Sequence, residues 1–230
     1  MPLVCATALP AFPPATAEKR LSALCARWER NLAPRVSPAQ MAHCRRFAQG
    51  ADALRARASR LLARLLALSA LPREATLDMD EAGRPLVTGA PGWRAAFTHS
   101  GAAAFCLLCA PGEGAAASPG APALDAEARG AASATDRAFA APAPSPGFSL
   151  RRWVLAEALF KARGAEPPLW ESVAGAAHAG TPRRLGFWQS GDARFCWRFL
   201  PAPGHVLCVA FPGEAVPPLP LRWRHWQELV

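Results

Sequence analysis

The sequence contains no uninterrupted apolar stretch of about 18 residues, the length that a membrane-spanning helix requires. Its first residues, Met1 to Ala6, also lack the basic segment that precedes the apolar part of a secretory signal. We therefore expect neither contact with a membrane nor secretion. With 230 residues, 51% of them hydrophobic, the chain can bury a substantial core in one large domain or two small ones.

Cysteine is too sparse for the disulfide framework of a small secreted domain, and the seven cysteines are scattered over the whole chain. This usage favours a reducing compartment, so we expect a cytoplasmic protein. Cys106 and Cys109 have the spacing of a metal or redox pair, but they lie in an apolar run, 105–110, that is typical of a strand. Residues three apart on a strand face opposite sides, and no second pair accompanies them. We interpret these cysteines as structural.

Lysine is nearly absent, because Lys19 and Lys161 are the only two among 26 basic residues. The net charge of +9 would suit nucleic acid, an acidic protein or a phosphorylated ligand. No helix-turn-helix, zinc-finger or basic-zipper pattern surrounds the arginine-rich segment 45–64. We therefore expect no nucleic-acid partner, although a basic nucleic-acid-binding protein remains an alternative.

Two amphipathic helices are expected in the first third of the chain. Between Glu18 and Leu32, apolar residues recur at helical spacing, at Leu21, Leu24, Cys25, Trp28 and Leu32. The segment 45–64 continues into a leucine-rich run, 61–66, that predicts a second helix. Its arginines could form a solvated helix face, and the alternative is a helix that reads DNA.

A group of polar residues follows these helices. Gly83-Arg84-Pro85 is typical of a tight turn that presents one cation. Further on, the strand-like run 95–97 leads into Thr98-His99-Ser100-Gly101. Hydroxyl groups, an imidazole and exposed backbone amides at a strand end suit a phosphate group.

Beyond a Gly/Ala/Pro/Ser-rich connector, 111–122, the short run Ala123-Leu124-Asp125-Ala126-Glu127 is expected to form a strand. The period of two puts the carboxylates of Asp125 and Glu127 on one face of it. Oxygen ligands of this kind suit magnesium, which is usually held by a few carboxylates, water and substrate phosphates. An isolated pair of this spacing is a weak signal by itself.

A helix is predicted after the proline-rich segment 128–147, with Ser149 as its cap and a buried stripe of Leu150, Val154, Ala158 and Ala162. Glu157 and Lys161 are four residues apart, so they project together beside that stripe. They could form an ordinary surface ion pair, but the rarity of lysine in this chain suggests that the identity of Lys161 matters. Two strand-like runs, 194–199 and 205–211, predict a hairpin near the end of the chain.

Taken in order, three of these patches resemble the signature of the Sfp-type (surfactin-type) 4′-phosphopantetheinyl transferases. That signature is an S-H-S turn, a G-[IV]-D-x-E strand and a W-x-x-K-E-[AS]-x-x-K helix. The matching stretches here are Thr98-His99-Ser100-Gly101, Leu124-Asp125-Ala126-Glu127, and Trp153 to Gly164. The family's basic N-terminal segment corresponds to Cys44-Arg45-Arg46-Phe47 followed by Asp52-Ala53-Leu54-Arg55, and its G-[KR]-P turn corresponds to Gly83-Arg84-Pro85.

The resemblance implies an α+β fold of two similar, pseudo-symmetric lobes, each a small antiparallel sheet with helices. We accordingly expect an N-terminal lobe over residues 1–110, a connector over 111–122 and a C-terminal lobe over 123–230. The family fold also implies a monomer.

The resemblance further implies a Mg²⁺-dependent enzyme, with Mn²⁺ as an alternative ion. It would transfer the 4′-phosphopantetheine arm of coenzyme A to a serine of an acyl- or peptidyl-carrier protein and release adenosine 3′,5′-bisphosphate. The residues implied in binding the phosphates of coenzyme A are Arg46, Arg55, Arg84, Thr98, His99 and Ser100. Asp125, Glu127 and Glu157 would hold the metal, Lys161 would neutralise charge at the pyrophosphate, and Glu157 would accept the serine proton.

One position of the helix departs from the family pattern. The family has a lysine where this chain has Ala156, and we expect Arg152, one turn earlier, to supply that charge. A catalytically silent protein that keeps the fold and binds coenzyme A is the alternative to the enzyme.

Overall fold

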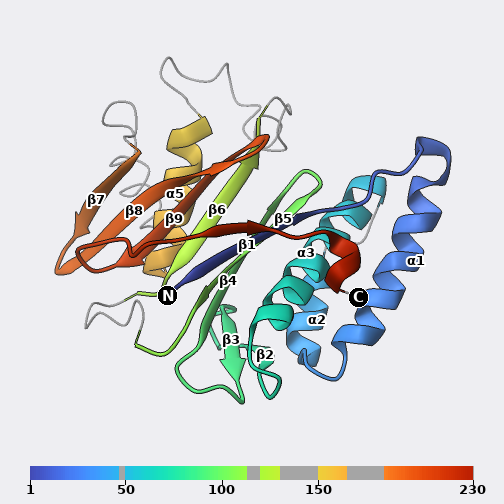
Figure 1. The fold of residues 1–230 in the computed structure, drawn as a ribbon, viewed down its shortest axis with the longest axis horizontal. Coiled ribbons are helices and arrows are strands. Elements are labelled where there is room, and N and C mark those ends of the chain that lie inside the picture. Colours follow the sequence, from blue (N-terminus) through green and yellow to red (C-terminus); the bar gives the residue numbers. More distant parts are fainter. Residues whose placement is uncertain (47–49, 113–119, 130–149, 165–183, 230) are drawn as a thin grey trace. The chain divides into compact units, whose positions relative to one another are not determined.

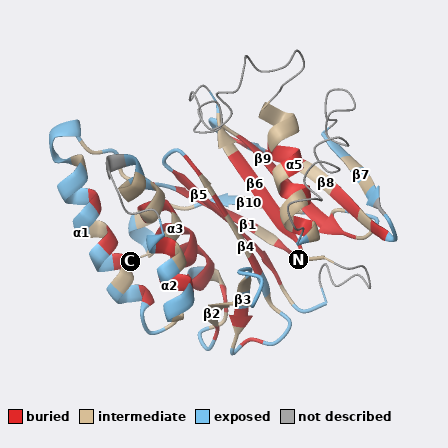
Figure 2. Cartoon of the chain, turned by 180° about the vertical axis from the view of Figure 1, so that it is seen from behind, coloured by how far each residue is buried: buried red, intermediate tan, exposed pale blue. Residues whose placement is uncertain are grey.

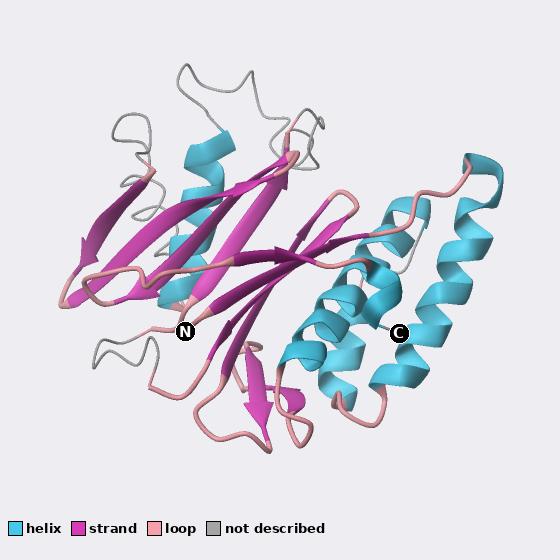
Figure 3. Ribbon diagram, in the orientation of Figure 1, coloured by secondary structure: helices cyan, strands magenta, loops and turns pink. Residues whose placement is uncertain are grey.

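The computed structural model describes residues 1–46, 50–112, 120–129, 150–164 and 184–229 (Figure 1). The chain divides into two compact units. Unit 1 comprises Met1–Glu113 and Pro218–Val230, and unit 2 comprises Gly114–Pro217. Helices and small, mostly antiparallel sheets occur together, as the secondary-structure colouring of Figure 3 shows, which confirms the predicted α+β class.

Unit 1 places helices against one four-stranded sheet of order β10-β1-β5-β4. Its strands are β1 (Leu3–Ala8), β4 (Arg94–Ser100), β5 (Ala103–Cys109) and β10 (Leu221–Trp223), and its helices are α1 (Pro14–Leu32), α2 (Pro38–Arg45), α3 (Gly50–Ala70) and the 3₁₀ helix η1 (Trp226–Leu229). A separate hairpin joins β2 (Thr76–Met79) to β3 (Pro85–Thr88). All seven residues of β5 are buried, as expected for a continuous apolar strand inside a sheet.

The predicted helices of unit 1 are both present. α1 starts at Pro14, earlier than expected, because proline is tolerated in the first turn of a helix. Four of its predicted apolar residues, Leu21, Cys25, Trp28 and Leu32, are buried. They pack into a core with the leucines of α3.

The described part of unit 2 contains a four-stranded antiparallel sheet of order β6-β9-β8-β7, against which the helix α5 packs (Figure 2). Its elements are β6 (Ala123–Ala128), α5 (Leu150–Arg163), β7 (Leu185–Ser190), β8 (Ala193–Ala202) and β9 (His205–Pro212). The expected hairpin is β8 and β9, and its turn contains Gly204 with φ +67°, a conformation that favours glycine. Ser149, the proline-rich segment and part of the connector lie outside the described residues.

The end of the chain does not belong to the unit in which it was expected. β10 pairs in parallel with β1, and η1 packs on the core of unit 1 through Trp226 and Leu229. The predicted C-terminal lobe of residues 123–230 is therefore wrong after Pro217. No periodic pattern in 218–230 indicates this pairing, because β10 is only three residues long.

The cysteines and the lengths of the helices bear on two further expectations. Cys106 and Cys109 lie in β5, and all seven cysteines are free and buried. Within the described ranges, no helix combines the length and the hydrophobicity that a membrane crossing would require.

A group of ion pairs links α1, α2 and α3 in unit 1. The carboxylate of Glu29 on α1 accepts hydrogen bonds from Arg45 of α2, the shorter at 2.7 Å, and from Arg57 of α3, the shorter at 2.6 Å. Burial raises the pKa of Glu29, but the bonds from Arg45 and Arg57 outweigh it and lower that pKa below its ordinary value. The pairing therefore stabilises the fold above the unfolded-state pKa and is lost as the pH falls through the folded-state pKa.

We expect Glu29→Gln to lower the free energy of unfolding at pH 7 by about 1–3 kcal/mol, because it removes the charge that Arg45 and Arg57 share. The deficit should shrink as the pH falls through the lowered pKa of Glu29, because the carboxyl group of the native protein then becomes protonated. Urea titrations at several pH values test this, with Glu18→Gln on the exposed face of α1 as the control. A deficit that stays the same from pH 7 down to the most acidic pH at which the protein is still folded would contradict the ion-pair explanation.

Candidate active site

The strand β6 carries both carboxylates of the predicted metal site. Ala123 of β6 and Cys208 of β9 belong to the core that α5 covers. Because side chains alternate along a strand, Asp125 and Glu127 follow Ala123 on that helix-covered face. Their shared face, as predicted from the spacing, is therefore confirmed.

α5 brings two further charged residues to the same region. It buries Val154, Ala158 and Ala162 as expected, and Leu155 and Leu159 as well, so its apolar stripe is wider than predicted. Gly164 ends the helix with φ +66°. The backbone amide of Ala121, just before β6, donates a 2.8 Å hydrogen bond to the carbonyl of Ala162. The start of β6 is thus tied to the turn of α5 that carries Lys161.

Lys161 connects the strand and the helix electrostatically. Its Nζ lies 2.6 Å from Oδ1 of Asp125 and 3.9 Å from Oε2 of Glu157. The side chain of Asp125 is 6% exposed, that of Glu157 25% and that of Lys161 37%. We call these three residues and Glu127 the carboxylate–lysine cluster. Lys161 and Glu157 are partly exposed, whereas Asp125 is buried.

The pKa values of the cluster show how its charges interact. Burial raises the pKa of Glu157, and the negative charges of Asp125 and Glu127 raise it further against the opposing effect of Lys161. Burial alone would lower the pKa of Lys161, but the charges of Asp125 and Glu157 outweigh it and raise that pKa. Lys161 therefore remains a cation at neutral pH, whereas Glu157 has an increased affinity for a proton or another cation.

The donor set of the cluster is compatible with magnesium. Among the described residues, no three His, Cys, Asp or Glu side chains form a ready-made metal-binding group. Mg²⁺ rarely uses such all-protein cages, and is usually held by one or two carboxylates together with water and substrate phosphates. Carboxylates that raise the pKa of a neighbouring carboxyl group create the negative potential that favours a divalent cation.

The helix position before Glu157 is more enclosed than the sequence suggested. Ala156 is 4% exposed and lies in the core of unit 2. A lysine there would have to extend out of that core, so the position is not an open site for a cation. Arg152, one turn earlier, is partly exposed. Its compensating role stays a prediction.

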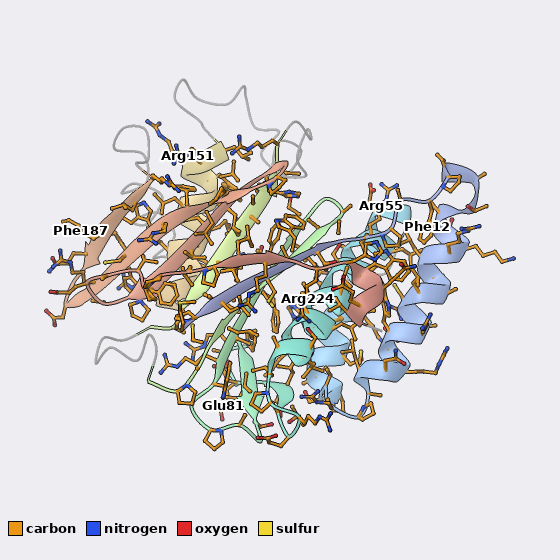
Figure 4. All side chains as sticks on the ribbon, viewed as in Figure 1. Phe12, Arg55, Glu81, Arg151, Phe187 and Arg224 are labelled. Atoms are coloured by element: carbon orange, nitrogen blue, oxygen red, sulfur yellow. The ribbon has the colours of Figure 1, made fainter. Side chains whose placement is uncertain are left out.

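Two of the arginines expected at the phosphate site of unit 1 have local acidic partners. Arg84 lies in the predicted turn, and its Nε is 2.7 Å from Oδ2 of Asp80. Arg55, labelled in Figure 4, lies 3.6 Å from Asp52 on the same helix. These contacts are exposed and weak, so a stronger anion could displace them.

The residues at the end of β4 do not all face the same way. Ala95 belongs to the core of unit 1 and Phe97 packs against it, so His99 projects toward the same helix-covered face. Thr98 and Ser100 project toward the opposite face. The strand geometry therefore separates Thr98 and Ser100 from His99, although the resemblance assigns all three to coenzyme A phosphates.

A buried arginine that the sequence analysis missed lies on the His99 side of the sheet. Arg64 of α3 is 3% exposed, and its guanidinium stacks 4.3 Å from the ring centroid of Phe97. Its hydrogen bonds within the described structure go to neutral oxygens, Oε1 of Gln40 at 3.0 and 3.2 Å and the carbonyl of Arg60 at 3.2 Å. Burial lowers the pKa of Arg64 because its charge lacks water.

Arg64 is part of a larger positive region. Burial lowers the pKa of His43, and the charges of Arg64, Arg60 and Arg46 lower it further. We call these four residues the basic cluster. Arg46, one of the predicted phosphate ligands, is among the charges that lower the pKa of His43. The four-residue spacing of Arg60 and Arg64 on an expected helix was the sequence signal for their shared face.

Arg55 lies apart from the basic cluster. It precedes Arg64 by nine residues, about two and a half helical turns, so the two side chains leave α3 on opposite sides. From the sequence, segment 45–64 was interpreted as one basic region. In the structure, α3 distributes its arginines over different faces of the helix.

A scan against models of protein families and a search of curated proteins found no match to this chain.

Proposed function

We propose that the protein transfers the 4′-phosphopantetheine arm of coenzyme A to a serine of an acyl- or peptidyl-carrier protein and releases adenosine 3′,5′-bisphosphate. The observation that carries this proposal is the carboxylate–lysine cluster, because Asp125 and Glu127 from a strand and Glu157 and Lys161 from a helix meet at one place. The two-lobed transferase fold of the resembling family is part of the proposal.

The cluster contains the groups that phosphoryl transfer needs. Attack of a serine on the pyrophosphate increases negative charge on non-bridging oxygens, which the Lys161 ammonium can stabilise. Asp125, Glu127 and Glu157 would hold Mg²⁺, which neutralises charge on the pyrophosphate when bound. Glu157 can accept the serine proton, because a carboxylate with a raised pKa is a better-matched base at neutral pH.

The basic cluster supports a role for unit 1 in binding phosphate. An arginine buried among neutral acceptors is costly unless an anion approaches it. Arg60 and Arg46 extend that positive region toward solvent, since Arg60 is half-buried and Arg46 is exposed. We assign the 3′-phosphate of coenzyme A to this region, together with His99, which projects from β4 on the same side of the sheet. Arg55, Arg84, Thr98 and Ser100 stay predicted ligands of the coenzyme A phosphates.

The decisive experiment is to incubate the protein with coenzyme A, MgCl₂ and a panel of apo-carrier proteins, and to weigh the carriers by mass spectrometry. We expect at least one carrier to gain the mass of phosphopantetheine, and the gain to disappear in excess chelator. Coenzyme A binding without modification of any carrier would favour the catalytically silent alternative. Transfer at full rate in chelator would exclude the metal role.

We expect dephospho-coenzyme A to bind more weakly than coenzyme A by about 1.5–3 kcal/mol, the contribution of a charge-assisted hydrogen bond. Arg60→Gln should weaken the binding of coenzyme A and leave that of dephospho-coenzyme A nearly unchanged, because the substitution removes a contact only with the 3′-phosphate. Calorimetry at fixed salt measures both affinities, with Arg30→Gln on exposed α1 as the control for loss of charge. If Arg60→Gln weakens both ligands equally, the assignment of the 3′-phosphate to the basic cluster is wrong.

A further inference from the structure

Two buried thiols of unit 1 stand directly opposite each other on neighbouring strands. Cys5 of β1 is the register partner of Cys106 of β5, and both belong to the same core. No other two of the seven free cysteines are register partners in the strand pairs of the described structure. Directly opposite residues of antiparallel strands have Cα atoms about 4.5–5.5 Å apart, within the separation that a disulfide accepts.

The two thiols differ in reactivity. A hydrogen bond from the Cys106 thiol lowers the pKa of Cys5 despite burial, and the charges of Arg224 and Arg222 lower it further. That same hydrogen bond, together with burial, raises the pKa of Cys106 well above its ordinary value. Cys5 is therefore the better nucleophile of the pair, and Cys106 is suited to react second.

The C-terminal segment borders the core that contains Cys5. β10 is the edge strand beside β1, and Cys5 pairs with Arg222 over a contact of only three residues. Arg224, labelled in Figure 4, follows directly. η1, which follows β10, packs on the same helix-covered core as Cys5. Short segments at the edge of a sheet open more readily than its middle, so local detachment of β10 together with η1 would give a small oxidant a path to Cys5.

We propose that Cys5 and Cys106 form an oxidative modification site, at which a peroxide converts the thiol pair into a cross-strand disulfide. The Cys5 thiolate attacks one peroxide oxygen, which forms an S–O bond, breaks the O–O bond and releases water or an alcohol after protonation. Cys106 then attacks the Cys5 sulfur, which forms the S–S bond and breaks the S–O bond. The Cys106 proton leaves with the hydroxide as water, so two thiols lose two electrons and the peroxide gains them.

The disulfide would join β1 to β5 across a loop of about 100 residues, and long loops gain the most from such a bond. The oxidised protein should therefore resist heat better than the reduced one. Cys106 also pairs with Phe97, on which Arg64 stacks, so the bond would form beside the basic cluster.

The experiment treats the reduced, folded full-length protein with a small excess of hydrogen peroxide and then blocks free thiols before unfolding. Peptide mapping should show a peptide pair joined through Cys5 and Cys106, and a mass loss of two hydrogens that dithiothreitol reverses. The melting temperature of the oxidised protein should rise by several degrees. Cys5→Ser should abolish the joined peptide and the rise, whereas Cys109→Ser, on the opposite face of β5, should change neither.

The proposal is overturned if all seven thiols stay reduced under these conditions, or if other cysteines pair in preference. It is also overturned if the Cys5–Cys106 bond forms only in urea, because the native strands would then not align the thiols. None of these outcomes depends on transferase activity.

Discussion

Asp125→Asn should slow phosphopantetheine transfer on the order of 10²–10³-fold, the loss typical of removing one preorganised charge from an active site. Asp125 is 6% exposed and lies 2.6 Å from Nζ of Lys161, so it both orients the lysine and contributes to the metal site. Asparagine keeps the shape of the side chain and removes only the charge. Rates with a carrier that the wild-type protein modifies, measured over a range of MgCl₂ concentrations, test this.

A slower transfer rate in Asp125→Asn must be distinguished from a loss of stability caused by breaking the Asp125–Lys161 ion pair. We expect Asp125→Asn to need more MgCl₂ for half-maximal rate, an effect that lost stability alone would not produce. Asp192→Asn, at an exposed position in the β7–β8 turn of the same unit, should behave like wild type. If Asp125→Asn transfers at the wild-type rate while remaining folded, the carboxylate–lysine cluster is not the active site.

Trp28→Ala should produce the largest loss of stability, about 3–5 kcal/mol, out of a total that is typically about 5–15 kcal/mol. Trp28 is fully buried between α1 and the rest of the unit 1 core, and its ring meets that of Trp226 edge-on at 6.2 Å between centroids. Alanine would leave a cavity that rigid helices cannot close. Urea unfolding followed by circular dichroism measures the loss without relying on tryptophan fluorescence.

Two comparison variants make this test specific. Trp28→Phe keeps most of the buried volume and removes an indole N–H that has no hydrogen-bond partner within the described structure, so it should cost much less. Trp223→Ala removes a side chain that is 40% exposed in the same unit and should also cost less. If all three variants lose similar stability, tight packing around Trp28 does not explain its contribution.

Local sequence patterns were sufficient to predict how the residues of the carboxylate–lysine cluster are arranged on their strand and on their helix. The two-residue spacing of Asp125 and Glu127 predicted their common face on β6, and the four-residue spacing of Glu157 and Lys161 predicted their common side of α5. These predictions hold because strand and helix periods are properties of consecutive backbone dihedrals. That the strand and the helix would meet could be inferred only from the family resemblance.

The arginines expected to bind the phosphates of coenzyme A were harder to interpret from their spacing in the sequence. Segment 45–64 contains arginines with different surroundings: Arg45 and Arg57 bind Glu29, Arg55 lies near Asp52, and Arg64 is buried under Phe97. The sequence showed only that these residues are basic. Except for Asp52, which is three residues from Arg55, these partners lie 16 to 33 residues away in the chain, and composition carries no information about such partners.

The sequence by itself determined the elements: the apolar stripe of α1, the carboxylate pair of β6, the helix α5 and the hairpin of β8 and β9. Each follows from short-range steric and hydrophobic periodicity. Only the tertiary structure decided that β10 returns to β1, that Lys161 pairs with Asp125 and that Cys5 stands opposite Cys106. Each of these contacts joins residues more than 30 positions apart within one unit, and they form because the core of each unit packs elements that are distant in the sequence, a cooperative result that no local pattern encodes.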